Sequence, residues 1–204
     1  MALIVRSFSA MDKLVITAAS QVTEAELSKA KLGPRSSRLD LASKMALMAV
    51  EALGLDFENM RRERIGICLS ARAGSLSTDV DYWNGRALVG GPSPTLFAYT
   101  LPSSAIGEIA IRYRLTGPNL CFIGGNGLFL AEACDLIYRG EVEGCLCVFC
   151  NVITAEAAEM IEEPPATKAC AAFVTEGGKG YPLTSFDRDM ETLCAKVCAR
   201  DQPT

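Results

Sequence analysis

The sequence predicts an α/β fold in which a mostly parallel, five-stranded sheet carries helices on both faces. Short apolar segments alternate with longer segments whose apolar residues recur every three or four positions, as expected for strands that alternate with helices. The segments Ile65–Leu69, Gly144–Cys150 and Cys170–Thr175 are almost wholly apolar, which is typical of strands covered on both faces. Glycine and proline punctuate the joints between segments.

The chain begins with a predicted strand pair. The strands are Leu3–Ala10 and Leu14–Ala18, with Met11–Lys13 as the turn. The polar segment Gln21–Arg35 ends in Gly33-Pro34, which predicts a loop.

The most regular helical pattern follows this loop. Ser37 and Asp40 form a start that resembles a capping box, and Gly54 is a natural C-terminal stop. Between them, apolar residues recur at helical spacing: Leu39, Ala42, Ala46, Ala49 and Leu53.

The middle of the chain continues the alternation. After Ile65–Leu69 we predict a loop at Ala71–Thr78, a helix at Val80–Leu88 that carries Trp83, and a break at Gly90–Pro94. A second helix is predicted at Ser103–Arg114, with four residues directed inward: Ile106, Ile109, Ala110 and Tyr113.

A strand at Leu120–Ile123 then enters a glycine-rich turn and a helix at Leu128–Arg139. The glycines at 124, 125 and 127 allow the backbone to turn sharply and to approach its neighbours closely. The helix places one apolar face inward, and Gly140 ends it; that face consists of Leu130, Ala133, Cys134 and Ile137.

The last third contains the strand Gly144–Cys150, an acidic and solvent-facing segment Glu156–Pro165, and a last core strand Cys170–Thr175. A C-terminal helix is expected to bury residues at helical spacing: Met190, Leu193, Cys194, Val197 and Cys198.

Composition sets limits on the class of protein. A length of 204 residues favours a single domain, residues 1–204. Hydrophobic residues make up 50% and charged residues 22%, so part of the surface is expected to pack on a partner. The net charge is −4, and the sequence lacks the clusters of Lys and Arg that nucleic-acid binding requires. No apolar run approaches the roughly 18 residues of a membrane span, and the start lacks a signal peptide, so we expect a cytoplasmic protein that binds no membrane.

The nine cysteines do not predict a disulfide framework, because their number is odd and no secretory signal precedes them. Cys145, Cys147 and Cys150 have the spacing C-x-C-x-x-C, which allows a metal site as one hypothesis. The chain has no histidine and no second C-x-x-C to complete such a site. Small buried hydrophobes are therefore the favoured interpretation, with no metal and no cofactor.

Several motifs together resemble the N-terminal half of β-ketoacyl synthases, which have the thiolase-like fold. The resemblance runs from about Arg35 to Val174. It rests on AVEALGLD, on RIGICLSARAGSLSTDVDYW and on SPTLFAYTLPSSAIGEIAIRYRLTGPN. These segments are similar to the family's AL-x-x-AGL helix, its RVGV-x-x-GT-x-x-G stretch and its SP…LPN…GPN run.

The resemblance implies a missing nucleophile. In that family a cysteine begins the helix after this turn, where the helix dipole favours its thiolate. Here the turn is Ile123-Gly124-Gly125-Asn126-Gly127, with Asn126 at the cysteine's position. The family also uses two histidines and a lysine from a C-terminal half to stabilise an enolate, and this chain contains no histidine.

The resemblance also implies that a second, similar half is lacking. A lone half would leave an apolar face exposed, at roughly 25 cal/mol per Å². We therefore expect a dimer or a heteromer, and we expect residues 187–204 to form a helix that covers this face.

These observations favour a non-catalytic, ketosynthase-like subunit of the chain-length-factor type, in fatty-acid or polyketide-type biosynthesis. Its expected partners are a full-length ketosynthase or a second copy, and an acyl carrier protein, with pairing through the strand near Leu120–Ile123. Candidate substrate-binding residues are Gly124, Gly125, Asn126, Gly127, Phe97 and Phe129, and further candidates for a tunnel lining are Leu96 and Phe122. The alternative is a homodimeric module that binds acyl thioesters or an acyl carrier protein.

One further hypothesis is an enzyme with another nucleophile, either Cys121 or a serine within Ser70–Ser77. Without histidine, a Ser–His or Cys–His pair is impossible within the chain. Cys121 is expected to be packed on its strand, which disfavours it.

Overall fold

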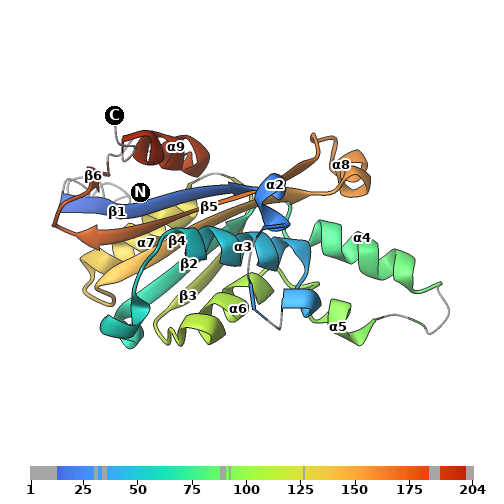
Figure 1. The fold of residues 1–204 in the computed structure, drawn as a ribbon, viewed down its shortest axis with the longest axis horizontal. Coiled ribbons are helices and arrows are strands. Elements are labelled where there is room, and N and C mark those ends of the chain that lie inside the picture. Colours follow the sequence, from blue (N-terminus) through green and yellow to red (C-terminus); the bar gives the residue numbers. More distant parts are fainter. Residues whose placement is uncertain are drawn as a thin grey trace, which may run out of the picture.

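The computed structural model describes residues 13–29, 32–33, 36–87, 91, 93–125, 127–183 and 189–200. A six-stranded sheet in the order β3-β2-β4-β5-β1-β6 forms its centre (Figure 1). The strands are β1 Leu14–Thr23, β2 Ile65–Ala71, β3 Asn119–Ile123, β4 Gly144–Ile153, β5 Ala166–Glu176 and β6 Tyr181–Pro182.

The α/β class is confirmed, but the expectation of five mostly parallel strands is corrected. Only β2 runs parallel to its neighbours β3 and β4. The pairs β4–β5, β5–β1 and β1–β6 are antiparallel. Strand β5 reverses direction because the short helix α8 (Ala155–Ile161) returns the chain into the sheet at the end where β4 stops. A mixed sheet results.

Helices cover both faces of this sheet. Helices α3 (Leu41–Ala52) and α6 (Ser104–Tyr113) pack on one face, where they share a core with β2, β4 and β5. Helices α7 (Leu128–Tyr138) and α9 (Met190–Arg200) pack on the other face (Figure 1). All four residues predicted for the inward face of α7 are buried, and so are Met190, Leu193, Cys194 and Val197 of α9.

Alternation along the strands divides side chains between the two cores. In β4, Leu146 and Val148 face α3 and α6, whereas Cys145 and Cys147 face α7 and α9. In β1, an irregularity in register lies between Ile16 and Ala18. Beyond it, even-numbered side chains of β1 point to the other face of the sheet. Ile16 belongs to the α7–α9 core, whereas Val22 belongs to the α3–α6 core.

The predicted loop at 21–35 is corrected in its first part. Strand β1 continues to Thr23, and the short helix α2 (Glu24–Leu27) follows it. The main-chain N–H of Thr23 donates to Glu26 Oε2 at 2.7 Å, which fixes this start. The predicted strand Leu3–Ala10 and most of the turn at 11–13 lie outside the described residues.

Helices α4 and α5 form an arm beyond the sheet. Helix α4 spans Leu76–Gly85, earlier than the predicted Val80–Leu88, and α5 spans Pro94–Phe97 (Figure 1). Asp40, rather than Ser37, is the N-cap of α3, and it accepts the Ser43 N–H at 3.0 Å. Short 3-10 helices lie at Ser36–Arg38, Phe57–Asn59 and Arg62–Arg64. Among the described residues, no helix has the length and apolar character needed to cross a membrane.

Candidate functional site

The glycine-rich turn connects β3 to α7, as the sequence predicted. Gly124 has φ +106°, and Gly127, the N-cap of α7, has φ +70°, which are backbone conformations that favour glycine. Gly124 N–H donates to the carbonyl of Ala71 at 2.9 Å, and the Ser70 hydroxyl donates to the carbonyl of Gly124. The end of β2 therefore holds the turn in place. Asn126 lies outside the described residues.

Arg72 lies beside Gly125 of this turn. It follows the last residue of β2, and its N–H donates to the carbonyl of Cys150 at 2.8 Å. Its Nε and Nη2 donate to the two carboxylate oxygens of Glu163, at 3.0 and 2.9 Å. Glu163 raises the pKa of the Arg72 guanidinium, so Arg72 stays charged. A Cβ at Gly125 would lie 2.8 Å from Arg72 Nη1.

A groove of about 580 Å³ opens beside this ion pair. It lies at the carboxyl ends of β1 and β4, the edge of an α/β sheet at which ligands usually bind. Its lining mixes apolar with charged and polar residues, and consists of Thr23, Arg72, Asn151, Ile153, Glu163, Pro164, Pro165, Ala166, Thr167 and Lys168.

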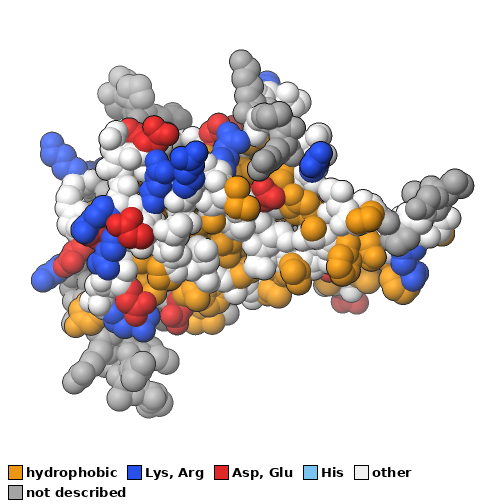
Figure 2. Space-filling model, turned by 90° about the horizontal axis from the view of Figure 1, so that it is seen from below, with side chains coloured by type: hydrophobic (Ala, Val, Ile, Leu, Met, Phe, Trp, Pro, Cys, Tyr) orange, Lys and Arg blue, Asp and Glu red, His pale blue; other side chains and the backbone are white. Residues whose placement is uncertain are grey.

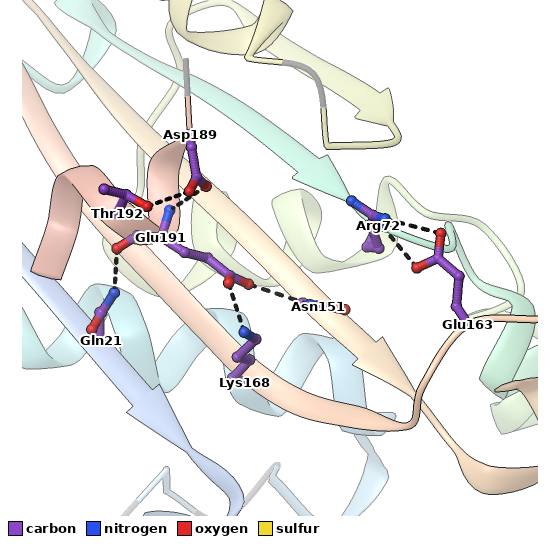
Figure 3. A network of polar contacts seen from close by, with 8 residues as sticks. All are labelled: Gln21, Arg72, Asn151, Glu163, Lys168, Asp189, Glu191 and Thr192. Carbon is purple, nitrogen blue, oxygen red and sulfur yellow. Dashed lines mark hydrogen bonds and ion pairs between the residues drawn. The ribbon is translucent and has the colours of Figure 1, made fainter. Parts of the chain in front are cut away.

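Glu191, at the start of α9, contacts two of the residues that line the groove (Figure 3). Glu191 accepts from Lys168 Nζ at 2.6 Å and from Asn151 Nδ2 at 3.3 Å. Gln21 Nε2 donates to the carbonyl of Glu191 at 2.6 Å. Asn151 Oδ1 is buried without a hydrogen-bond partner among the described residues. Each of the two cations that line the groove, Arg72 and Lys168, is thus paired with a carboxylate, Glu163 or Glu191.

Sequence reasoning missed these polar residues. Arg72 did carry a signal, because it comes directly after a buried strand, where functional side chains of α/β proteins gather. Glu163, Lys168 and Glu191 carried none, since only the tertiary structure brings them to one place.

The two candidate phenylalanines lie in different surroundings. Phe129 is 1% exposed and packs against Phe149, with ring centroids 6.3 Å apart, in the core beneath α7. Phe97 is 60% exposed on α5, with its ring centroid 5.5 Å from that of Tyr82. Leu96 lies on α5, and Phe122 is a partly buried residue of β3 that packs against the α7–α9 core. A role in substrate binding stays a prediction for each of them.

A second, enclosed cavity lies between α3, β2 and the segment before α6. It measures about 10 Å³, which leaves room for no more than a water molecule. Tyr99 and Asp40 are among its lining residues. Burial and the hydrogen bond to Glu108 raise the pKa of Tyr99 to about 12.

The C-x-C-x-x-C segment does not converge on one point. Cys145 and Cys147 belong to the α7–α9 core, and Cys150 belongs to the opposite core. Among the described residues, no group of three or more potential ligands is placed to hold a metal. The hydrogen bond with Cys145 and burial raise the pKa of the Cys68 thiol, and burial raises that of Cys150 to about 12. These thiols are packed and neutral at physiological pH.

Cys121 corrects an expectation. It is exposed on β3, rather than packed against the core. Desolvation raises the pKa of its thiol, and no cation contributes to the shift. Nucleophilic cysteines have a lowered pKa, so Cys121 lacks the activation that they require.

Strand β3 is one edge of the sheet, and it pairs only with β2 among the described strands. It carries no charged residue, no proline and no bulge within Asn119–Ile123, the features that usually protect an edge strand. Figure 2 shows that hydrophobic side chains gather on one face of the molecule. Five large hydrophobic side chains of β3, α6, α5, α4 and the segment before α6 are exposed. They are Ile123, Ile111, Leu101, Phe97 and Trp83, each at least 60% exposed. We call these five residues and β3 the edge surface.

No family model and no curated protein matches the sequence. Solved structures match the fold. The ishigamide ketosynthase/chain length factor aligns with 86% of this chain and 64% of its own chain, at 23% identity and a TM-score of 0.65. A complex of ketosynthase ApeO with its chain length factor ApeC from Xenorhabdus doucetiae aligns with 93% of this chain and 92% of its own chain, at 18% identity and a TM-score of 0.65.

Two more structures agree. A type II polyketide-synthase acyl-carrier protein in complex with its ketosynthase, AntDE:AntF, aligns over 81% and 62%, at 15% identity and a TM-score of 0.66. A β-ketoacyl synthase from Burkholderia phymatum aligns with 81% of this chain and 59% of its own chain, at 13% identity and a TM-score of 0.61. The chain thus spans less than two thirds of the matched chain in three of the four cases. It has the thiolase-like ketosynthase fold, as the motifs predicted.

Proposed function

We propose that this chain is a non-catalytic, ketosynthase-like subunit of the chain-length-factor type, which pairs with an active ketosynthase in fatty-acid or polyketide-type biosynthesis. The edge surface is the observation that carries the proposal. A strand edge without protecting charges is a template for pairing with another chain. Exposed apolar side chains beside it are typical of a protein interface.

The face that carries α7 and α9 offers fewer exposed apolar side chains. Most apolar residues of these helices are buried in the core beneath them, Leu128 and Tyr138 of α7 are exposed, and α9 presents Thr192, Ala195 and Lys196 outward. The helix predicted for the C-terminal segment lies on the same face as α7. We infer from this difference that a partner binds at the edge surface.

Several features support a subunit without its own condensing activity. The sequence places Asn126 where the resemblance implies a cysteine, and it contains no histidine. The exposed Cys121 lies on the edge strand, where no cation contributes to its pKa. A thiolate and enolate-stabilising donors would therefore come from the partner.

The comparisons support this proposal through the complexes in which the matched chains occur. Three of the matched structures carry a ketosynthase together with a chain length factor or an acyl carrier protein. In the ApeO–ApeC complex, the matched chain has nearly the length of this one, because 93% of one aligns with 92% of the other. A chain of nearly this length is thus present in that complex.

Native co-purification, followed by mass spectrometry, tests the proposal. We expect recovery of a full-length ketosynthase with its own cysteine and histidines. Recovery of a homodimer alone would overturn it in favour of the acyl-thioester-binding module. A short thiol-reactive cross-linker then locates the interface: Cys121 should link to the partner, and Cys121→Ser should abolish the link. The matched control Cys198→Ser, on α9, should leave it unchanged.

A further inference from the structure

The edge surface draws its side chains from two parts of the molecule. Ile123 and Ile111 belong to β3 and to α6, which packs on the sheet. Phe97 and Trp83 belong to α5 and α4, the two helices of the arm (Figure 1). The loop between β2 and the arm contains Gly74, which has φ +61°. A partner can contact both parts at once only when the arm holds a set orientation toward the sheet.

Contacts between α4 and the segment that contains α5 hold the arm together. The ring centroids of Tyr82 and Phe97 lie 5.5 Å apart. The Ser75 hydroxyl, at the N-cap of α4, donates to the carbonyl of Thr100 at 2.8 Å. The orientation of the whole arm is therefore decided where α4 begins. We call the first turn of α4, residues 76–79, the root of the arm.

Two buried hydroxyl groups fasten this root to the rest of the protein. Ser77 and Thr78 are only 7% and 5% exposed. Thr78 Oγ1 donates to Asp40 Oδ2 at 2.8 Å. The Ser77 hydroxyl donates to the carbonyl of Val152 at 3.4 Å and accepts the N–H of Thr154 at 3.0 Å. Hydrogen bonds weaken steeply when their angle changes, whereas apolar contacts have no direction, so these bonds fix the orientation of α4.

Asp40 joins the root to the helix layer that covers the sheet. Its Oδ1 accepts the N–H of Ser43 at 3.0 Å, which caps α3, and its Oδ2 accepts the hydroxyl of Thr78. We propose that Asp40 is a positioning residue, which fixes the arm and the arm's part of the edge surface relative to the sheet. This inference rests on the proposed function, because it assigns a role within the surface that binds the partner.

Three variants separate the contact with the arm from the capping of α3. Thr78→Val replaces the hydroxyl by a methyl group and leaves the cap of α3 in place. Asp40→Ser keeps a residue type that caps helices well, but it lacks the second oxygen that Thr78 requires. Asp40→Asn retains both contacts, because its carbonyl oxygen accepts the Ser43 N–H and its amide group bonds to the hydroxyl of Thr78.

Hydrogen exchange of the Thr154 amide, measured by NMR on the isolated full chain, reports on the root directly. This N–H donates to Ser77, so it exchanges when the root separates from β4. Thr78→Val and Asp40→Ser should each speed its exchange about tenfold, since each removes a hydrogen bond to a carboxylate. The double variant should be no faster, because both changes remove the same bond. Asp40→Asn should exchange at the original rate, and Val148, within β4, should be unchanged throughout.

Thr192→Val is the matched control, because it removes another threonine–aspartate bond, to Asp189 at the start of α9. It should leave exchange at Thr154 unchanged. An unchanged rate at Thr154 in Thr78→Val would overturn the positioning role. Equal acceleration at Thr154 and Val148 would show a general loss of stability and would also overturn it.

Binding to a ketosynthase is the second measurement, and it makes the two proposals fail separately. Thr78→Val and Asp40→Ser should weaken this binding by at least about threefold, because fewer molecules hold the arm in the orientation that binds, and Asp40→Asn should bind as tightly as the unchanged chain. Faster exchange with undiminished binding would overturn the role of Asp40 in the edge surface. In a chain that binds no ketosynthase, faster exchange at Thr154 would leave the positioning of the arm standing and remove the proposed function.

Discussion

Ile123 and Ala71 lie side by side at the carboxyl ends of β3 and β2, in parallel register, yet Ile123 is 67% exposed and Ala71 only 4%. Two apolar residues of neighbouring strands thus have opposite environments. The difference arises because β3 is the edge of the sheet and β2 has strands on both sides.

Ile123→Lys should abolish pairing with a partner chain while leaving the fold intact. A lysine on an edge strand opposes the addition of another strand, and the side chain already faces solvent. Size-exclusion chromatography with light scattering measures the assembly, and circular dichroism checks the fold. Ala195→Lys, on the outer surface of α9, is the matched control and should assemble normally. Normal assembly of Ile123→Lys would place the interface elsewhere.

Gly117→Ala should destabilise the protein by about 3 kcal/mol or more. A Cβ at this position would lie 2.2 Å from the main-chain oxygen of Ile65, and a backbone atom cannot move aside as a side chain can. This contact explains the glycine of the GPN motif. Urea unfolding measures the effect. Gly107→Ala, within α6 and with nothing close to its Cβ, should instead stabilise by up to about 1 kcal/mol.

Leu193→Ala should cost about 2–5 kcal/mol of unfolding free energy, because Leu193 is 1% exposed in the core beneath α9. Thermal or urea unfolding gives the value. Ala199→Ser, at an exposed position of the same helix, should change it by no more than about 0.5 kcal/mol. Equal small costs for the two variants would show that α9 is not an integral part of the second helix layer.

Stability should fall as the pH rises from about 9 toward 12. Burial raises the pKa of the Cys134 and Cys150 thiols to about 12 in the folded chain, above that of a thiol in the unfolded chain. A raised folded-state pKa contributes stability that is complete below the unfolded pKa and is lost as the unfolded chain ionises. Unfolding free energies at a series of pH values measure this loss. Cys150→Ala should reduce the slope, and an unchanged slope would contradict the assignment.

Element positions could be predicted because their signals are local. The spacing of Leu130, Ala133, Cys134 and Ile137 predicted α7 and its buried face, since helical periodicity repeats within a few residues. The apolar segment from Ile65 predicted β2 for the same reason. Strand direction was not predictable, because whether β5 runs with or against β4 depends on how the chain returns through α8, and apolar runs do not record this.

The candidate site likewise has features that could be predicted from the sequence and features that could not. The sequence by itself determined the glycine-rich turn, the asparagine at its centre and the absence of histidine, because these are matters of residue identity. Only the tertiary structure decided that Cys121 is exposed, that α9 shares a face with α7, and that Arg72 meets Glu163 over Gly125. Arg72 and Glu163 are separated by 91 residues, and their contact depends on strand order and loop paths. Local patterns specify which residues are buried, whereas such long-range polar contacts depend on how the packed elements are arranged in space.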